Sequence, residues 1–243
     1  MIDLAKTVRE IALEQPTSIR VFENFGIDYC CGGRKPLGEA CADRKLSVKE
    51  VVEALDSAAG RPATSTADWQ QSSLAQLIDH IVVTHHAYVK RELPRLATLA
   101  QKVVNRHGET QAHLPAIQEA LAQLDQELTH HLGKEEHVLF PYVARLEAAL
   151  GSGSTLPERC FGSVVNPIAM MTREHDAAGM ILAGIRRMSD NFTTPAGACP
   201  TYHAFYDGLK EFEQDLHQHI HLENNILFPR AIEMELTTVG TAA

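Results

Sequence analysis

The chain has 243 residues, of which 44% are hydrophobic, and its 22 Lys and Arg residues face 31 Asp and Glu residues for a net charge of −9. This length suits one large domain, or one medium and one small domain, with a substantial core. Residues 1–62 are nearly neutral and the remainder is strongly acidic. The acidic body argues against nucleic acid binding, which needs a basic face.

No stretch approaches the roughly 20 apolar residues of a membrane-spanning helix. The first fifteen residues are amphipathic with mixed charge and do not resemble a signal peptide. Five cysteines, two of them adjacent, do not make a disulfide framework and are more typical of free thiols or metal ligands. We therefore expect a cytoplasmic monomer or homodimer with no membrane partner.

Residues 1–62 are expected to form a small helical domain. The apolar periodicity and the breaks at Pro16 and Gly26 predict three short helices, over residues 4–14, 17–25 and 47–58. The last of them opens with a capping-box sequence that starts at Ser47. Gly60-Arg61-Pro62 and the polar residues after it predict a linker over 63–72.

From Ser73 the pattern changes to long amphipathic helices, and the expected fold is all-α. Apolar residues at i, i+3 and i+4 spacing predict four helices, near 73–105, 115–149, 167–190 and 201–234. The connections between them favour an antiparallel four-helix bundle over residues 73–236.

Several prolines bear on where these helices begin and end. Pro115 and Pro167 suit a first helical position, with Asn166 as the cap of the third long helix. Three other prolines fall inside or near helix ends and are expected to kink or terminate them: Pro94, Pro141 and Pro229.

A pattern of histidine and glutamate repeats in the two halves of the bundle. His131-x3-Glu135 returns 88 residues later as His219-x3-Glu223, and Leu-Phe-Pro follows each copy. His86 precedes the first copy by 45 residues, and His175 precedes the second by 44. Residues i and i+4 share one face of an α-helix, so each His-Glu pair can point at one place in the bundle interior.

Four imidazoles and two carboxylates that converge from four helices predict a dinuclear metal site. Imidazole and carboxylate without thiolate suit iron, manganese or zinc, and we expect iron first and manganese second. Two non-heme iron ions that share two bridging glutamates each receive two histidines. This leaves room for an oxo or hydroxo bridge and an open position for a small ligand.

A single His-x3-Glu match more often lies on a solvated helix face, and it is the doubling with matched spacings that favours a metal site. One rival stays open, a surface chelate of His217 and His221, which are also four residues apart. The other histidines are unassigned: His80, His85, His107, His113, His130, His137 and His203.

Cys30 and Cys31 are adjacent and are followed by two glycines that let the backbone approach a partner closely. The pair suggests a thiol relay, a transient iron or sulfur site, or a docking point for a client protein. The plainer alternative is an incidental pair in a tight loop. Three further cysteines have no partner spacing and are expected to be structural: Cys41, Cys160 and Cys199.

The His-Glu constellation resembles the hemerythrin-like four-helix bundle, and the segment Asp28–Gly33 in front of it makes the chain similar to the repair-of-iron-centres family. The resemblance also rests on motifs along the bundle: Asp79-His80-Ile81 with His86, Lys134-Glu135-Glu136, Glu174-His175-Asp176 with Gly179, and Leu222-Glu223-Asn224-Asn225. It implies terminal ligands at four histidines and bridges at two glutamates: His86, His131, His175 and His219, with Glu135 and Glu223.

The resemblance also implies a second histidine near the site at His107. His85 directly precedes His86, so the spacing alone selects His86.

The resemblance further implies a di-iron stress-response protein that helps to repair iron–sulfur clusters damaged by nitrosative or oxidative stress. Its partners would be damaged iron–sulfur proteins, with nitric oxide as a small ligand. The alternatives are a nitric oxide reductase that forms nitrous oxide, or a nitric oxide or oxygen scavenger, at the same site.

Overall fold

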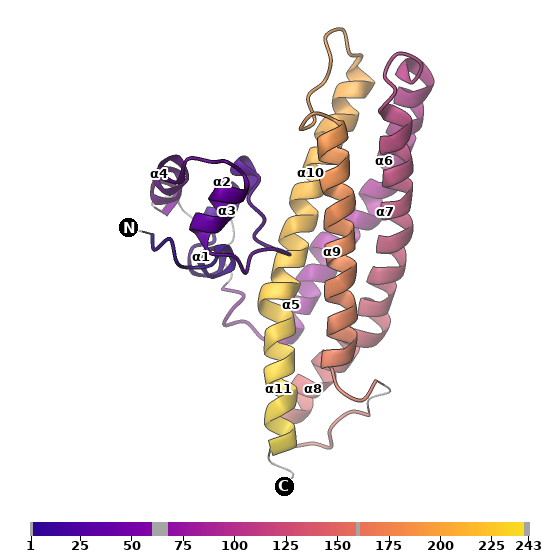
Figure 1. Cartoon of the computed structure of the whole chain (residues 1–243). Coiled ribbons are helices and arrows are strands. Elements are labelled where there is room, and N and C mark those ends of the chain that lie inside the picture. The colour runs from indigo at the N-terminus through magenta and orange to yellow at the C-terminus, as the bar shows by residue number, and fades with distance from the viewer. Residues whose placement is uncertain (1, 60–67, 159–160, 241–243) are drawn as a thin grey trace.

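The computed structural model describes residues 2–59, 68–158 and 161–240, and the regular secondary structure within these ranges is helical, apart from one isolated bridge between Thr7 and Pro36. A small group of helices lies beside one long bundle (Figure 1). The expected all-α fold is confirmed. In the described part of the chain no helix is both long enough and apolar enough to cross a bilayer.

The N-terminal group has four short helices, α1 (Val8–Glu14), α2 (Ser18–Phe25), α3 (Leu37–Asp43) and α4 (Val48–Ala59). The sequence did not predict α3. Thr7 begins α1 with a complete capping box, in which its side chain and that of Glu10 each accept a backbone N–H of the other residue. The expected linker falls partly on residues 60–67, which lie outside the described residues.

Four long rods form the bundle, close to their expected bounds. Three of them contain a short π-helical segment, named η1 to η3. In chain order the elements are α5 (Leu74–His80), η1 (Ile81–His86), α6 (Ala87–His107), α7 (Leu114–Lys134), η2 (Glu135–Leu139), α8 (Phe140–Ser152), α9 (Val165–Met188), α10 (Pro200–Leu222), η3 (Glu223–Leu227) and α11 (Phe228–Gly240).

The π segments explain how the repeated prolines fit within continuous rods. Phe140 and Phe228 each donate a backbone N–H to the carbonyl five residues earlier, and the next residue is a proline, which has no N–H. The rods do not end at Pro141 or Pro229, because the ladder has already shifted where each proline interrupts it, and the expected kink at these prolines stays a prediction. Pro94 likewise lies inside α6, which continues past it.

The third rod begins earlier than expected. Its helix α9 starts at Val165, so Pro167 is the third helical residue and Asn166 is not the cap. The carboxylate of Glu235, from the far end of the chain, accepts the backbone N–H of Val164 and the hydroxyl of Ser163. A helix start that depends on a residue 70 positions away leaves no local sequence signal.

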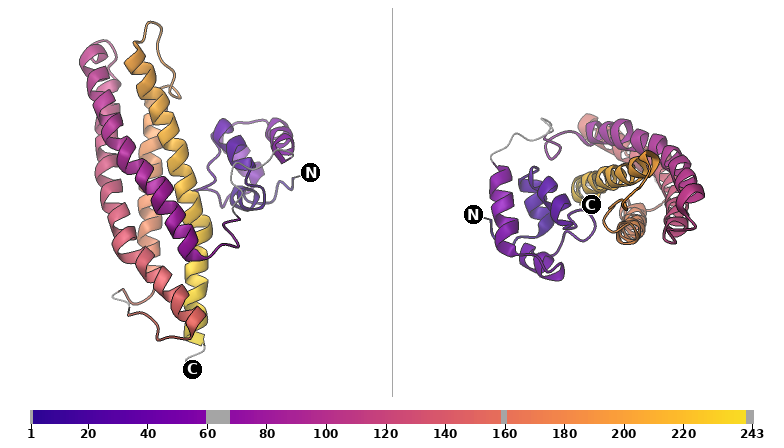
Figure 2. Two further views of the ribbon diagram at one scale, coloured as in Figure 1. Left: turned by 180° about the vertical axis from the view of Figure 1, so that it is seen from behind. Right: turned by 90° about the horizontal axis from the view of Figure 1, so that it is seen from above.

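The N-terminal helices lie along the α10 and α11 side of the bundle in both side views and from above (Figure 2). Arg9 donates to the carbonyl of Asn225 at 3.2 Å, and this is the oxygen that Pro229 leaves without its helical partner. The Asn225 side chain donates to the carbonyl of Tyr29 at 3.0 Å. These bonds hold the loop that follows α2 against η3.

Candidate metal centre

The structure brings all six residues of the repeated pattern together. His131, His175 and His219 come from α7, α9 and α10, while the other three lie at the π segments: His86, Glu135 and Glu223. All six side chains are at most 3% exposed in the bundle interior. Burying this much charge requires mutual pairing or metal ions.

The six side chains form two groups that share both glutamates. One group contains His86 and His219, the other contains His131 and His175, and each includes Glu135 and Glu223 with ligand atoms within 4.8 Å of one another. Two cations held this way would each have two imidazoles and share two carboxylates. The arrangement is consistent with a di-metal site.

The short distances between histidine nitrogens fit two ligands of one metal ion better than they fit two imidazoles in direct contact. The Nε2 atoms of His86 and His219 are 3.1 Å apart, and those of His131 and His175 are 3.0 Å apart. Metal–nitrogen bonds of about 2.1 Å at a right angle place two nitrogens about 3.0 Å apart. Two imine nitrogens repel each other at this distance unless a proton or a cation lies between them.

Several buried polar atoms of the cluster have no hydrogen-bond partner within the described residues. They include both carboxylate oxygens of Glu135 and one of Glu223. Histidine nitrogens lie 3.0 to 3.4 Å from these oxygens, outside hydrogen-bonding geometry. Orphaned buried acceptors of this kind are costly in a closed core, so they fit an arrangement prepared for cations.

In the absence of metal, protonated histidines offset the negative charge of the two glutamates. Burial lowers the pKa of His86, but the adjacent carboxylates of Glu135 and Glu223 outweigh it and raise that pKa to about 10. Burial also lowers the pKa of His131, but the negative charge of Glu135 outweighs it, and the pKa rises to about 9. Burial favours the neutral form of Glu223, yet the neighbouring histidines, His219 first, hold its pKa well below the usual range.

Carboxylates behind two of the histidines orient them and are neutralised by lysines. His86 Nδ1 lies 2.8 Å from Glu136, which also accepts from Lys90 at 2.6 Å. His131 Nδ1 lies 2.9 Å from Glu174, which also accepts from Lys134. Such contacts fix the tautomer and orientation of a ligating imidazole. Neither contact was predicted from the sequence, although Glu136 and Glu174 each adjoin a predicted ligand in the chain.

The phenylalanine of each Leu-Phe-Pro tail packs on a histidine of the cluster. Phe140 stacks on His86 with ring centroids 5.6 Å apart, and Phe228 stacks on His175 at 5.9 Å. Each Leu-Phe-Pro tail therefore packs an aromatic ring against the histidine and glutamate cluster and also places a proline directly after the π segment and this phenylalanine.

The unassigned histidines have other partners. His85 Nδ1 lies 3.0 Å from Asp215, so His86 is the member of this pair that enters the cluster. His107 was expected near the site, but it contacts Cys199, with Nε2 3.3 Å from Sγ, in place of the cluster. The rival pair is no surface chelate, because His217 binds Glu23 at 2.9 Å and the buried His221 accepts from Asn225 at 2.8 Å.

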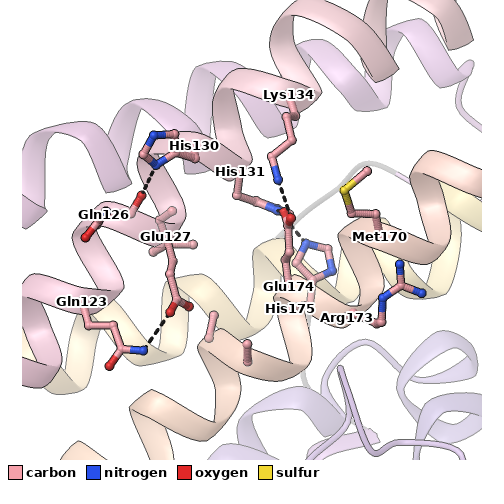
Figure 3. A pocket seen from close by; sticks show the side chains of 13 residues that line it. Gln123, Gln126, Glu127, His130, His131, Lys134, Met170, Arg173, Glu174 and His175 are labelled. Atoms are coloured by element: carbon pink, nitrogen blue, oxygen red, sulfur yellow. Dashed lines mark hydrogen bonds and ion pairs between the residues drawn. The ribbon is translucent and has the colours of Figure 1, made fainter. Parts of the chain in front are cut away.

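A cavity of about 640 Å³ between α7 and α9 reaches one side of the cluster. Figure 3 shows His131, Glu174 and His175 in the middle of the lining residues, with Lys134 pointing at the Glu174 carboxylate. Gln123 and Glu127 lie to one side of them, and Met170 and Arg173 lie to the other. His131 and His175, which belong to the same four-residue group, therefore both line this cavity.

The loop with the two thiols sits against the outside of the cluster. Asp28 accepts the backbone N–H groups of Cys30, Cys31 and Gly32 at 2.8 to 3.0 Å. A Cβ at Gly33 would lie 2.6 Å from the carbonyl oxygen of Tyr29, so this turn needs a glycine. Among the described cysteines all are free, and Cys160 lies outside the described residues.

The bundle and its site define the class of protein. Residues 77–231, more than half of the chain, match the family model described as the Hemerythrin HHE cation binding domain. Residues 4–59 match ScdA_N, described as a domain of unknown function (DUF542).

Relatives match both parts of the chain at once. The chain is 38% identical over 226 residues to "Iron-sulfur cluster repair protein YtfE" of Escherichia coli O157:H7, which covers 93% of this chain and 96% of the relative. Proteins with the same name from Citrobacter koseri and Shigella boydii serotype 4 are 38% and 37% identical over the same shares. The chain belongs to this family of iron–sulfur cluster repair proteins, the repair-of-iron-centres family.

Proposed function

We propose that this protein repairs iron–sulfur clusters damaged by nitrosative or oxidative stress, and that two non-heme iron ions in the bundle serve this function. The observation that carries the proposal is the pair of four-residue groups that share Glu135 and Glu223. The relatives, which this chain matches over nearly their whole length, are named iron–sulfur cluster repair proteins, and this name supplies the substrate class.

In this proposal each of the six residues has a defined role. His86 and His219 are terminal ligands of one iron, and His131 and His175 are those of the other. The two glutamates bridge the pair and supply the negative charge that two adjacent cations need. Iron in this setting supplies redox chemistry and reversible binding, because imidazole and carboxylate hold it less tightly than a thiolate cage holds a soft metal.

The remaining groups position the ligands and balance charge. The Glu136–Lys90 and Glu174–Lys134 pairs hold His86 and His131 in one orientation. The proposed role of Cys30 and Cys31 is a thiol relay between the bundle and damaged iron–sulfur proteins, the clients. The position of the loop supports this role, since Cys31 Sγ lies 3.8 Å from the backbone carbonyl oxygen of His175.

The cavity beside His131 favours a second candidate, the binding of nitric oxide and its reduction to nitrous oxide at the same two irons. Two nitric oxide molecules, two electrons and two protons give one nitrous oxide and one water. The two Fe(II) ions would supply the electrons, and a separate donor must then reduce them again. A scavenger that only binds nitric oxide or oxygen needs the same cavity and no donor.

Recovery of a nitric-oxide-damaged [4Fe-4S] enzyme, incubated without oxygen with the reduced and iron-loaded protein, tests the proposal. We expect recovery with the wild-type chain and none with Glu135→Ala/Glu223→Ala. A variant with Cys30→Ala and Cys31→Ala tests the relay in the same assay. No recovery, together with nitric oxide consumed and nitrous oxide evolved, would replace repair with the second candidate.

A further inference from the structure

Three metal-binding side chains outside the bundle centre lie close together in the loop after α2. The Sγ atoms of Cys30 and Cys31 are 3.6 Å apart, and Asp28 Oδ1 is 3.5 Å from Cys30 Sγ. Each of the three residues offers a ligand atom that lies within 4.8 Å of those of the other two. The sulfurs are in contact without a bond, so both thiols are available.

The separations match the edges of a tetrahedral metal site. Bonds of about 2.3 Å to sulfur and about 2.1 Å to oxygen place two sulfurs about 3.8 Å apart, and a sulfur and an oxygen about 3.6 Å apart. The observed 3.6 and 3.5 Å fall slightly inside these values, so a cation needs little movement of the loop to enter.

The loop holds the carboxylate in place before any metal arrives. Asp28 Oδ1 accepts the N–H groups of both cysteines, and Oδ2 accepts that of Gly32. An ionised carboxylate offers about four acceptor positions, of which these three N–H groups take three, so one position on Oδ2 remains for a cation, and Asp28 is exposed. A fixed ligand loses less conformational freedom when it binds.

The surroundings suit an anionic metal–thiolate complex. A divalent cation with two thiolates and one carboxylate has a net charge of −1. Arg9 and Arg34 line the same cavity as the two thiols, a space of about 250 Å³ between the loop, α9 and α11. This cavity leaves room for a fourth ligand, water or a group from another molecule.

We propose that Asp28, Cys30 and Cys31 bind a third divalent metal ion, of the borderline class that includes Fe²⁺ and Zn²⁺, separate from the two positions in the bundle. Binding releases both thiol protons and forms two metal–sulfur bonds with no change of oxidation state. The inference concerns metal binding by the loop and is independent of whether the protein repairs clusters.

The site lies next to the bundle centre without sharing a ligand with it. Cys31 Sγ contacts the His175 carbonyl, and the Asn224 side chain joins the carbonyl of Cys30 to the ring of His175. A metal ion on the loop is therefore separated from the bundle centre by one layer of protein groups. The position suits an ion on its way into or out of the bundle.

Cobalt(II) titration of the full-length, reduced protein tests the site, after the bundle has first been loaded with two equivalents of Fe²⁺ without oxygen. Thiolate–cobalt charge-transfer absorption reports sulfur ligation, which the bundle residues cannot give. We expect this absorption to saturate at one cobalt per chain. Cys30→Ser and Cys31→Ser should each abolish it and leave the iron content unchanged, whereas Cys41→Ser is the matched control that should retain it.

Asp28→Asn can keep the oxygen that accepts from both cysteines, loses the acceptor for Gly32 and removes the anionic ligand, so we expect cobalt to bind at least about tenfold more weakly to that variant. Three results would overturn the proposal. They are no thiolate band, a band that survives in both cysteine variants, or saturation at half an equivalent per chain, which means that two loops share one ion.

Discussion

Asn224 links the ring of His175 to the N-terminal helices. Its Oδ1 lies 3.0 Å from His175 Nδ1, and its Nδ2 donates to the carbonyl of Cys30 at 3.3 Å. Because an amide has distinct donor and acceptor ends, this second bond fixes which end faces the histidine. The loop that carries the thiols thus helps to orient a residue of the candidate metal centre.

Replacement of Asn224 by alanine should weaken iron binding. Without the amide, His175 loses the contact that fixes its tautomer and ring orientation, a loss that typically costs 10- to 100-fold in metal affinity. A competition titration with a metal-binding dye measures the change. Asn105→Ala, on the exposed surface of α6, is the control, and equal affinities for the two variants would remove the positioning role of Asn224.

Iron uptake by the metal-free protein should release about two protons at pH 7, because a histidine must be neutral to bind metal. The pKa of His86 is raised to about 10 and that of His131 to about 9, so both are protonated at this pH. Affinity should therefore increase as the pH rises toward these values. Calorimetry in buffers with different ionisation enthalpies counts the protons, and identical heats in all buffers would contradict the assignment.

The same pKa values predict how the stability of the metal-free protein depends on pH. A folded pKa of about 10 for His86, against about 6.5 in the unfolded chain, gives stability that is complete below pH 6.5 and is lost as the pH rises through 10. The loss should be a few kcal/mol in the free energy of unfolding measured with urea. The free energy of unfolding of His86→Gln should fall less over this pH range. Equal falls in the two proteins would show that His86 is not the source of the pH dependence.

Arg9→Ala should loosen the N-terminal helices from the bundle. Arg9 bonds the Asn225 carbonyl that Pro229 leaves unpaired, and a charged hydrogen bond of this kind contributes roughly 1.5–3 kcal/mol. Backbone hydrogen exchange over residues 28–33 should accelerate by about tenfold or more. The exposed Arg20 provides the control variant, and unchanged exchange in Arg9→Ala would show that other contacts dominate the interface.

The helix positions and the convergence of the six residues follow from helical periodicity. The i, i+4 rule separated His219 from His217 and His221, and the equal spacings selected His86 over its neighbour His85. The structure places these residues as the periodicity predicts. Their ligation, the domain bounds and the cytoplasmic location stay predictions.

Features that depend on distant residues were not predictable. A π segment is a register shift of the hydrogen-bond ladder, and only the repeated proline hinted at it. Glu23 contacts α10 and Tyr29 contacts η3 through bonds that span almost 200 residues of chain, so neither shows a local pattern. The start of α9 depends in the same way on Glu235.

The iron content and Mössbauer spectrum of the anaerobically reconstituted protein test the shared-carboxylate site most directly. We expect two iron ions per chain in the wild type, magnetically coupled after oxidation, and coupling that disappears when Glu135 and Glu223 are replaced by alanine. One iron per chain, or two uncoupled ions whose spectrum is insensitive to both glutamates, would contradict the site proposed here.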